Sequence, residues 1–233
     1  NSGQKLALFC QKQSQPCRMS GVKIITIEGA DGTGKQTQVE MLVRALRANE
    51  TPVETLSFPR YDTFYGRIIK ACLKGDFGEK EEIDPREFAV LYTLDRVSAQ
   101  RQIKQWLDDD KYIVLDRYLE SNIGHQAAKY PRGEWEERMH EMYDFEVFSG
   151  VTPSDLVVLL ELPADVAEEA MQSERRNKDI HDSDIKYQLR VRDAYSFAAK
   201  LFEWRTVDCM SDGRRLSVEE VNKKVLEVVA RIL

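Results

Sequence analysis

The chain has 233 residues, of which 42% are hydrophobic and 32% are charged, and its formal net charge is −6. This length suits one large α/β domain or two small ones. The acidic balance excludes a global basic surface, so no nucleic-acid partner is expected. No apolar stretch approaches the roughly 20 residues that cross a bilayer, so no membrane association is expected either.

The first 21 residues differ in composition from the rest of the chain. They contain three basic residues, no acidic residue and the run Gln13-Ser14-Gln15. We treat residues 1–21 as an N-terminal extension, for which an expression tag, a disordered natural segment and a remnant of a targeting segment are competing interpretations. The four cysteines form no C-x-x-C pair, which is typical of reduced thiols in an intracellular protein. A cytoplasmic location is expected, and the extension leaves an organellar or nuclear one open.

Strand and helix patterns alternate from Val22 onward. Apolar strands are predicted over Val22–Ile27, Val53–Phe58, Tyr112–Leu115, Leu156–Leu160 and Thr206–Asp208. Helices are predicted over Gln36–Ala48, Thr63–Leu73, Pro85–Leu107, Glu120–Lys129, Glu134–Val147, Ala164–Ser173, Ser183–Trp204 and Val218–Ile232. Strands that are apolar on both faces and are joined through helices indicate a parallel sheet covered on both sides, here one doubly wound domain with a mobile insert.

The most informative motif follows the first predicted strand. It reads Glu28-Gly29-Ala30-Asp31-Gly32-Thr33-Gly34-Lys35-Gln36-Thr37 and opens into a predicted helix. The pattern G-x-x-x-x-G-K-[ST] is met at Gly29, Gly34 and Lys35. Gln36 stands where a hydroxyl side chain normally contacts Mg²⁺, and Thr37 comes one residue late. Because strand, lysine and helix are in register, a phosphate-binding loop is favoured over an ordinary glycine-rich turn.

Two further motifs follow neighbouring predicted strands. Phe58-Pro59-Arg60-Tyr61 comes after the second strand and Asp116-Arg117-Tyr118 after the third. Ligands of parallel α/β sheets bind beyond the carboxyl ends of the strands. Each arginine alone would suit a surface position, but two of them at strand ends beside a phosphate loop favour phosphate contacts.

Five motifs in this order resemble those of the thymidylate kinase family. They are E-G-x-D-G-x-G-K at Glu28–Lys35, F-P-R at Phe58–Arg60, Leu94-Asp95-Arg96, D-R-Y-x-x-S at Asp116–Ser121 and P-x-D at Pro153–Asp155. The resemblance covers residues 22–232. It implies a P-loop NTPase fold of three α/β/α layers around a five-stranded parallel sheet. It also implies a nucleoside monophosphate kinase domain over residues 22–233 with a lid near 173–183. Members transfer the γ-phosphate of ATP to dTMP, giving dTDP for dTTP synthesis, and are commonly homodimers.

The resemblance also implies how the donor is bound. It assigns ATP binding to Gly29, Asp31, Gly32, Thr33, Gly34, Lys35, Gln36 and Thr37, and catalysis to Lys35, Asp116, Arg117, Arg175 and Arg176. Some members carry an arginine after the loop aspartate, where Gly32 stands here, and members that lack it supply arginines from the lid. For the segment with Arg175 and Arg176, a solvated helix end is the alternative. Mg²⁺ is the expected cofactor. It would be held by Asp31 and Asp116, or through phosphate oxygens and waters.

The implied acceptor site draws on several loops and one helix. It comprises Asp31, Phe58, Pro59, Arg60, Tyr92, Arg96, Arg117, Ser121, Asn122, His125 and Gln126. Tyr92 and Arg96 are four residues apart and share a helix face. In the family an aromatic residue here stacks on thymine and an arginine binds a ring carbonyl, whereas a core aromatic is the alternative for Tyr92. His125 stands where many relatives have tyrosine near the sugar, which leaves discrimination against a 2′-hydroxyl open.

Three other functions compete with this interpretation. The first is a kinase of another pyrimidine nucleotide or of a deoxynucleoside. The second is a P-loop switch, which is disfavoured because a guanine-reading N-K-x-D motif is missing. The third is an inactive homologue, for which Gln36 is the only support.

Overall fold

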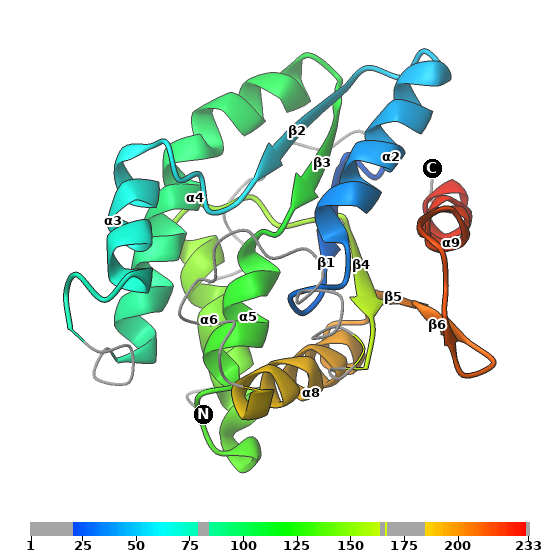
Figure 1. Ribbon diagram of the computed structural model, residues 1–233. Coiled ribbons are helices and arrows are strands. Elements are labelled where there is room, and N and C mark those ends of the chain that lie inside the picture. The colour runs from blue at the N-terminus through cyan, green and yellow to red at the C-terminus, as the bar shows by residue number, and fades with distance from the viewer. Residues whose placement is uncertain (1–20, 79–83, 164–165, 167–184, 232–233) are drawn as a thin grey trace, which may run out of the picture.

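The computed structural model describes residues 21–78, 84–163, 166 and 185–231. Its centre is a five-stranded parallel sheet between two layers of helices (Figure 1). The strands are β1 (Ile24–Glu28), β2 (Val53–Ser57), β3 (Tyr112–Asp116), β4 (Leu156–Glu161) and β5 (Arg205–Asp208), in the order β2-β3-β1-β4-β5. The predicted fold class and all five predicted strands are confirmed, with ends that differ by one or two residues.

The helices lie within a few residues of their predicted bounds. They are α2 (Lys35–Ala48), α3 (Phe64–Leu73), α4 (Pro85–Asp108), α5 (Leu119–Ala127), α6 (Trp135–Phe148), α8 (Ile185–Leu201) and α9 (Val218–Ala230), with a 3₁₀ turn at Arg132–Glu134. Asp84 and Ser217 cap α4 and α9 through their side chains, as these residue types do at helix starts. The predicted helix over Ala164–Ser173, apart from residue 166, lies outside the described residues, as do residues 1–20 and the lid near 173–183.

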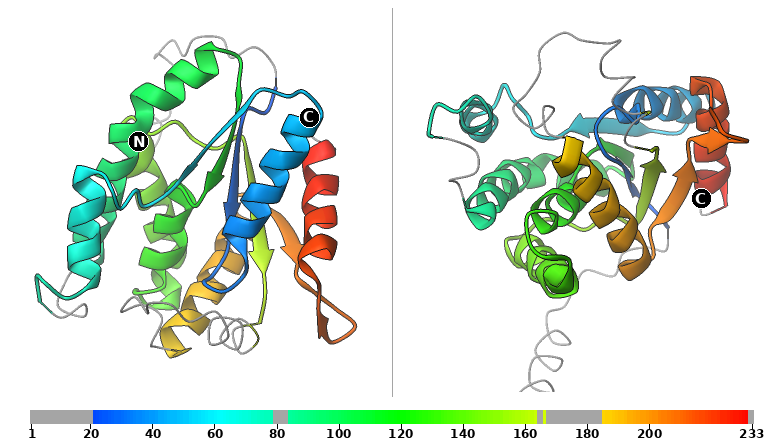
Figure 2. Two further views of the ribbon diagram at one scale, coloured as in Figure 1. Left: turned by 45° about the horizontal axis from the view of Figure 1, so that its top comes forward. Right: turned by 60° about the horizontal axis from the view of Figure 1, so that its bottom comes forward.

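Alternating strand residues feed two hydrophobic cores on opposite faces of the sheet. Ile24 packs with α4, α5, α6 and α8, whereas Ile25 and Ile27 pack with α2 and α9. Figure 2 shows α2 and α9, the blue and red helices, side by side on one face. Gln38 and Asn222 join these two helices through a hydrogen bond of 3.1 Å. The helix that follows the phosphate loop is therefore supported by the last helix of the described chain.

A short hairpin after β5 was not predicted. It consists of β6 (Met210–Ser211) and β7 (Arg214–Arg215), which pair antiparallel. Asp212 and Gly213 both have positive φ, as a two-residue hairpin turn requires. Strands of two residues are too short to produce an alternating pattern, so the sequence carries no clear signal for them.

Candidate active site

The glycine loop between β1 and α2 has the geometry of an anion-binding loop. Gly34 has φ 84° and caps α2, so the helix begins at Lys35 with its N-terminus next to the loop. A Cβ atom at Gly29 would lie 2.7 Å from the Leu160 carbonyl oxygen, so only glycine fits there. Backbone N–H groups and the positive end of a helix dipole both favour phosphate at such a position.

Lys35 is buried within this loop. Its Nζ donates a hydrogen bond of 2.8 Å to the Ala30 carbonyl oxygen and lies 3.9 Å from the Asp31 carboxylate. Burial, and next the positive charge of Arg117, lower the pKa of Lys35 to about 8, and the acidic neighbours offset this only in part. A bound anion would restore the full charge of Lys35, because a nearby negative charge favours the protonated amine.

Arg117 lies in the turn between β3 and α5 and is held from both sides. Its φ of 61° is in the left-handed region, which costs free energy for a residue with a Cβ atom. Two bonds to β1 fix the turn: the Arg117 amide donates to the Ile27 carbonyl oxygen at 3.2 Å, and the Tyr118 amide donates to Glu28 Oε1 at 2.9 Å. Glu28 therefore positions Arg117, a role that the sequence motif did not reveal.

The Arg117 side chain joins the glycine loop to α5. Its guanidinium forms an ion pair with Asp31, and its Nη1 lies 3.1 Å from His125 Nε2. Although burial opposes the charged form, Asp31 and the other acidic neighbours raise the pKa of Arg117, so it stays charged. Because arginine can only donate, His125 Nε2 accepts this bond. Nδ1 of the same ring faces the Tyr187 hydroxyl at 3.3 Å.

A cavity of about 430 Å³ opens beside this cluster, at the carboxyl ends of the strands. Ten of the eleven predicted acceptor-site residues line it: Asp31, Phe58, Pro59, Tyr92, Arg96, Arg117, Ser121, Asn122, His125 and Gln126. Gly32 and Asp116 also contribute to the wall. Ser57, Tyr61, Leu73, Tyr118 and Tyr187 line it as well, and sequence reasoning had not named them as site residues. The predicted residues are thus brought together, although they come from four separate segments.

Arg60 differs from the other ten acceptor-site residues. It does not line the cavity, and its guanidinium binds the Asp95 carboxylate, with Nε and Nη2 at 3.1 and 2.9 Å from Oδ1. A further bond runs to Ser98. Its predicted contact with an acceptor phosphate therefore stays a prediction.

The cavity wall also combines an aromatic ring with a buried cation. Tyr92 stacks on Phe88 with ring centroids 6.3 Å apart and is itself only partly buried. Burial raises the pKa of Tyr92, so its hydroxyl stays protonated. Tyr92 thus packs on Phe88 and also lines the cavity, and its stacking on a base stays a prediction. Arg96 is 1% exposed and donates from Nη1 to the Tyr118 carbonyl oxygen at 3.2 Å.

Asp116 fits a divalent cation better than Asp31 does. Asp116 Oδ2 accepts a bond of 3.1 Å from the Ser57 hydroxyl, while its Oδ1 is buried and has no hydrogen-bond partner in the described part of the chain. Asp31 is engaged by Arg117 and Lys35. Mg²⁺ in phosphoryl-transfer sites takes one or two carboxylates together with phosphate oxygens and waters. Within residues 21–78, 84–163 and 185–231 no larger cluster of metal-binding side chains occurs.

The remaining predicted donor residues lie around the loop or beyond the described chain. Thr33 is buried and donates from Oγ1 to the Ala30 carbonyl oxygen at 2.8 Å. Gln36 and Thr37 are exposed on the first turn of α2, and the Gln36 amide contacts Glu40 at 3.2 Å. Arg175 and Arg176 lie outside the described residues. Arg215 of the hairpin donates to the Gly32 carbonyl oxygen at 3.4 Å, which brings one more cation to the loop.

The comparisons with known proteins agree with one another. The sequence profile of a family described as "Thymidylate kinase" matches residues 27–225. The chain is 32% identical over 209 residues to a thymidylate kinase of Mycobacterium tuberculosis, which covers 83% of this chain and 95% of that protein. It is 30% identical to a probable thymidylate kinase of Pyrococcus abyssi, with 88% and 94% of the two chains covered. Its fold is similar to a solved thymidylate kinase structure from Candida albicans, with a TM-score of 0.70 at 22% identity, covering 91% of this chain and 93% of that one.

Proposed function

The chain belongs to the thymidylate kinase family, and we propose that its cavity binds dTMP while the adjoining glycine loop binds ATP. The enzyme transfers a phosphoryl group from ATP to dTMP, giving dTDP and ADP. The observation that carries the site assignment is the ion pair between Asp31 of the donor loop and Arg117 of the acceptor cavity. A kinase of another substrate and an inactive homologue are not favoured.

Charge stabilisation is the main task of the residues around the phosphates. Lys35 and the loop amides hold the donor phosphates, and Arg117 lies where donor and acceptor meet. Phosphoryl transfer depends on such positioning and on neutralising the charge of the transferred group. Ala30 holds Lys35 and Asp31 holds Arg117 before any substrate arrives, so little reorganisation is needed in the transition state. We further propose that Arg175 and Arg176, in a lid near 173–183 of a kinase domain over 22–233, close over the phosphates.

Tyr92 and Arg96 are the residues we assign to the base. The Tyr92 ring stacks on a flat pyrimidine, and the Arg96 guanidinium donates to a ring carbonyl. We assign the sugar to the part of the cavity lined by His125, which contacts both Arg117 and Tyr187.

Mg²⁺ is the cofactor we propose, with Asp116 as its main protein ligand. Asp116 Oδ1, which has no partner within the described chain, supplies a hard oxygen ligand at the cavity wall. When bound, the ion neutralises charge on the donor phosphates. Gln36, which has no hydroxyl group, then leaves more of the coordination to phosphate oxygens and water.

We also propose that the enzyme is a homodimer and acts in the cytoplasm. Large exposed side chains support an interface on α3 and α6: Phe64 is 64% exposed and Phe148 is 92% exposed. The long helices α4 and α8 carry fewer such side chains: among the large exposed hydrophobics of the described chain, Val90 lies on α4 and Leu189 on α8. Phe148→Ser should lower the mass measured by light scattering.

No helix in the described chain is long and apolar enough to cross a membrane.

A coupled ADP-release assay tests the site assignment. With ATP–Mg²⁺ and a panel of dTMP, dUMP, UMP, dCMP, AMP, dGMP and thymidine, we expect a strong preference for dTMP. Lys35→Ala should abolish turnover, whereas Lys111→Ala, a surface lysine paired with Glu54, serves as the matched control. Folded Lys35→Ala protein with normal turnover would reject the donor assignment.

A further inference from the structure

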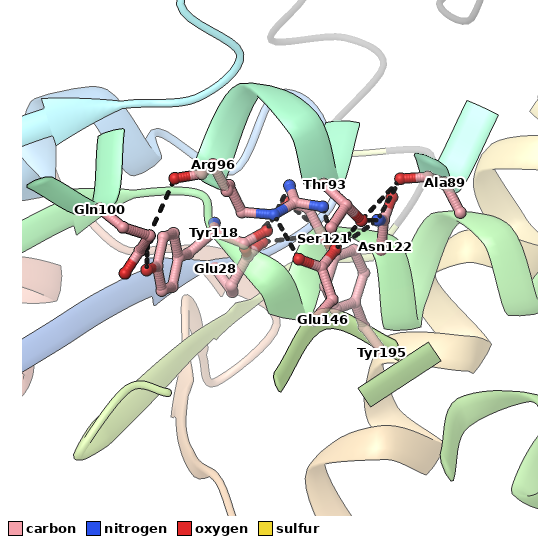
Figure 3. Close-up of polar contacts among 10 residues, drawn as sticks. All are labelled: Glu28, Ala89, Thr93, Arg96, Gln100, Tyr118, Ser121, Asn122, Glu146 and Tyr195. Carbon is pink, nitrogen blue, oxygen red and sulfur yellow. Dashed lines mark hydrogen bonds and ion pairs between the residues drawn. The ribbon is translucent and has the colours of Figure 1, made fainter. Parts of the chain in front are cut away.

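Glu146 is a fully buried carboxylate behind the base-binding end of the cavity. It lies in the last turn of α6 and is 0% exposed. No residue of α6 belongs to the cavity wall that the described chain forms. The Glu146 carboxylate nevertheless contacts two wall residues, Arg96 of α4 and Asn122 of α5 (Figure 3). It therefore acts on the site only through other side chains.

Four hydrogen-bond donors converge on this carboxylate. Arg96 donates from Nε to Oε2 at 3.0 Å and from Nη2 to Oε1. Asn122 Nδ2 donates to Oε1 at 2.6 Å. The Thr93 hydroxyl lies 2.8 Å from Oε1 and 2.8 Å from the Ala89 carbonyl oxygen, and its single hydrogen serves one of these acceptors at a time. A carboxylate can only accept, so it can serve all of these donors. A neutral side chain of the same shape cannot do so.

The carboxylate fixes the orientation of the Asn122 amide. Nδ2 gives one bond to Glu146 and another to the Ala89 carbonyl oxygen at 3.1 Å. Both partners accept only, so the nitrogen must face them and both of its hydrogens are used. The group that Asn122 can offer to a ligand is therefore its oxygen, which is an acceptor.

The same carboxylate leaves Arg96 as a donor. A guanidinium has five N–H groups, and in the described chain three of them are engaged by Glu146 and the Tyr118 carbonyl oxygen. The remaining N–H groups have no acceptor among the described residues and can donate to a ligand. The wall thus combines a donor from Arg96 with an acceptor from Asn122, each held in that role by Glu146.

The Arg96 donor and the Asn122 acceptor are complementary to the hydrogen-bonding edge of thymine and not to that of cytosine. Thymine presents the O4 acceptor beside the N3–H donor, whereas cytosine presents the N4 amino donor beside an unprotonated N3. We propose that Glu146 is a positioning residue that makes the site select thymine over cytosine, by holding Arg96 as donor and Asn122 as acceptor. This inference rests on the proposed role of Arg96 in binding the base.

Glu146→Gln is the test, because it keeps the size of the side chain and removes one acceptor. We expect the KM for dTMP to rise and the ratio of kcat/KM for dTMP over dCMP to fall by about ten- to a hundredfold, the range for a lost hydrogen bond to a charged group. The KM for ATP should not change. Thr93→Val is the matched control, because it disturbs the same buried cluster while leaving the bonds that Arg96 and Asn122 donate to Glu146 in place. Its dTMP/dCMP ratio should stay close to that of the wild type.

Glu146→Asp keeps the inference testable if the glutamine variant does not fold. It retains the charge but is too short to reach both partners, so a smaller shift in the same direction is expected. A folded Glu146 variant with an unchanged ratio overturns the inference, as does a Thr93→Val shift as large as that of Glu146→Gln. Arg96→Lys distinguishes a wrong assignment of Arg96 to the base from a wrong role for Glu146. If it leaves the ratio unchanged, the assignment of Arg96 to the base is wrong; if it lowers the ratio while the Glu146 variants do not, only the role of Glu146 is rejected.

Discussion

Asp31 and Arg117 form an ion pair that joins the glycine loop to the turn after β3 at the wall of the cavity. Asp31 belongs to the loop after β1, and Arg117 follows β3, the strand that pairs with β1. The two halves of the site are therefore connected by a charged contact before either nucleotide binds.

Asp31→Asn should weaken acceptor use more than donor use. The amide keeps the size of the side chain but loses the charge that holds Arg117, and charge-assisted bonds are roughly twice as strong as neutral ones. We expect kcat/KM for dTMP to fall about tenfold or more, with a smaller change in the KM for ATP. Asp109→Asn, a surface carboxylate near Lys111, is the control. Equal effects of the two substitutions would show that the pair does not position Arg117.

ATP binding should weaken above about pH 8 through Lys35. In the folded protein burial and then Arg117 lower the pKa of this lysine to about 8, from 10.5, so the free enzyme loses the charge that phosphate requires. The KM for ATP should rise by up to about tenfold per pH unit above 8, while kcat at saturating ATP persists to higher pH because bound phosphate raises the pKa. The contribution of Lys35 to the free energy of unfolding changes in the opposite direction. Between pH 8 and 10.5 the unfolded chain binds more protons than the folded one, so the destabilising effect of the buried lysine lessens as pH rises.

Lys35→Arg supplies the control for this pH profile. Arginine stays charged throughout the range, so any activity that it retains should show a flat KM for ATP between pH 7 and 9.5. A flat profile in the wild-type enzyme would contradict the role of Lys35.

Arg60→Ala should destabilise the protein through Asp95. The Asp95 side chain is 1% exposed and binds the Arg60 guanidinium, so removal of the arginine leaves a buried charge without its cation, at a cost of about 3 kcal/mol. The double variant Arg60→Ala/Asp95→Asn should recover part of this loss in urea unfolding. A double variant that is no more stable than Arg60→Ala would refute the argument.

The KM of the double variant for dTMP tests the phosphate contact separately. If Arg60 binds the acceptor phosphate, this KM should rise at least about tenfold.

Glu120→Gln should change the pH dependence of stability. Burial, and next the charge of Glu28, raise the pKa of Glu120 from 4.5 to about 8, and its Oε2 has no hydrogen-bond partner in the described chain. The folded state therefore keeps a proton that the unfolded state loses, so this group's contribution to stability is present below about pH 4.5 and is lost as pH rises to 8. The variant should gain at least about 1 kcal/mol over the wild type at pH 9 relative to pH 5. Glu136→Gln, an exposed glutamate of α6, should show no such difference in urea unfolding.

The fold was predictable because its signals are local. Each central strand is a short apolar run between helical patterns, and Asp84 and Ser217 mark helix starts by their own side chains. Most residues that the family resemblance implies for the acceptor line one cavity for a related reason, since they follow strand ends or share one helix face.

Residues that act through tertiary packing were not predictable in this way. Glu146 stands among several acidic residues of α6, and nothing in its neighbourhood along the chain distinguishes it from the exposed ones. It is buried because Arg96, fifty positions earlier, needs a counter-charge. The same holds for Arg60, whose predicted phosphate role took no account of Asp95.

The central place of β1 has a consequence for how the enzyme is made. β1 pairs with β3 and β4, so Ile24 and Ile25 can pair only after Ile113 and Leu156 have been synthesised. Helix α2 likewise gains its support from α9, which is synthesised later still. The phosphate loop is therefore among the first described segments to leave the ribosome and among the last to acquire its final surroundings. Nascent chains arrested before Val218 should retain little ATP, whereas released full-length chains should retain it, and strong retention by the shorter chains would disprove this order of assembly.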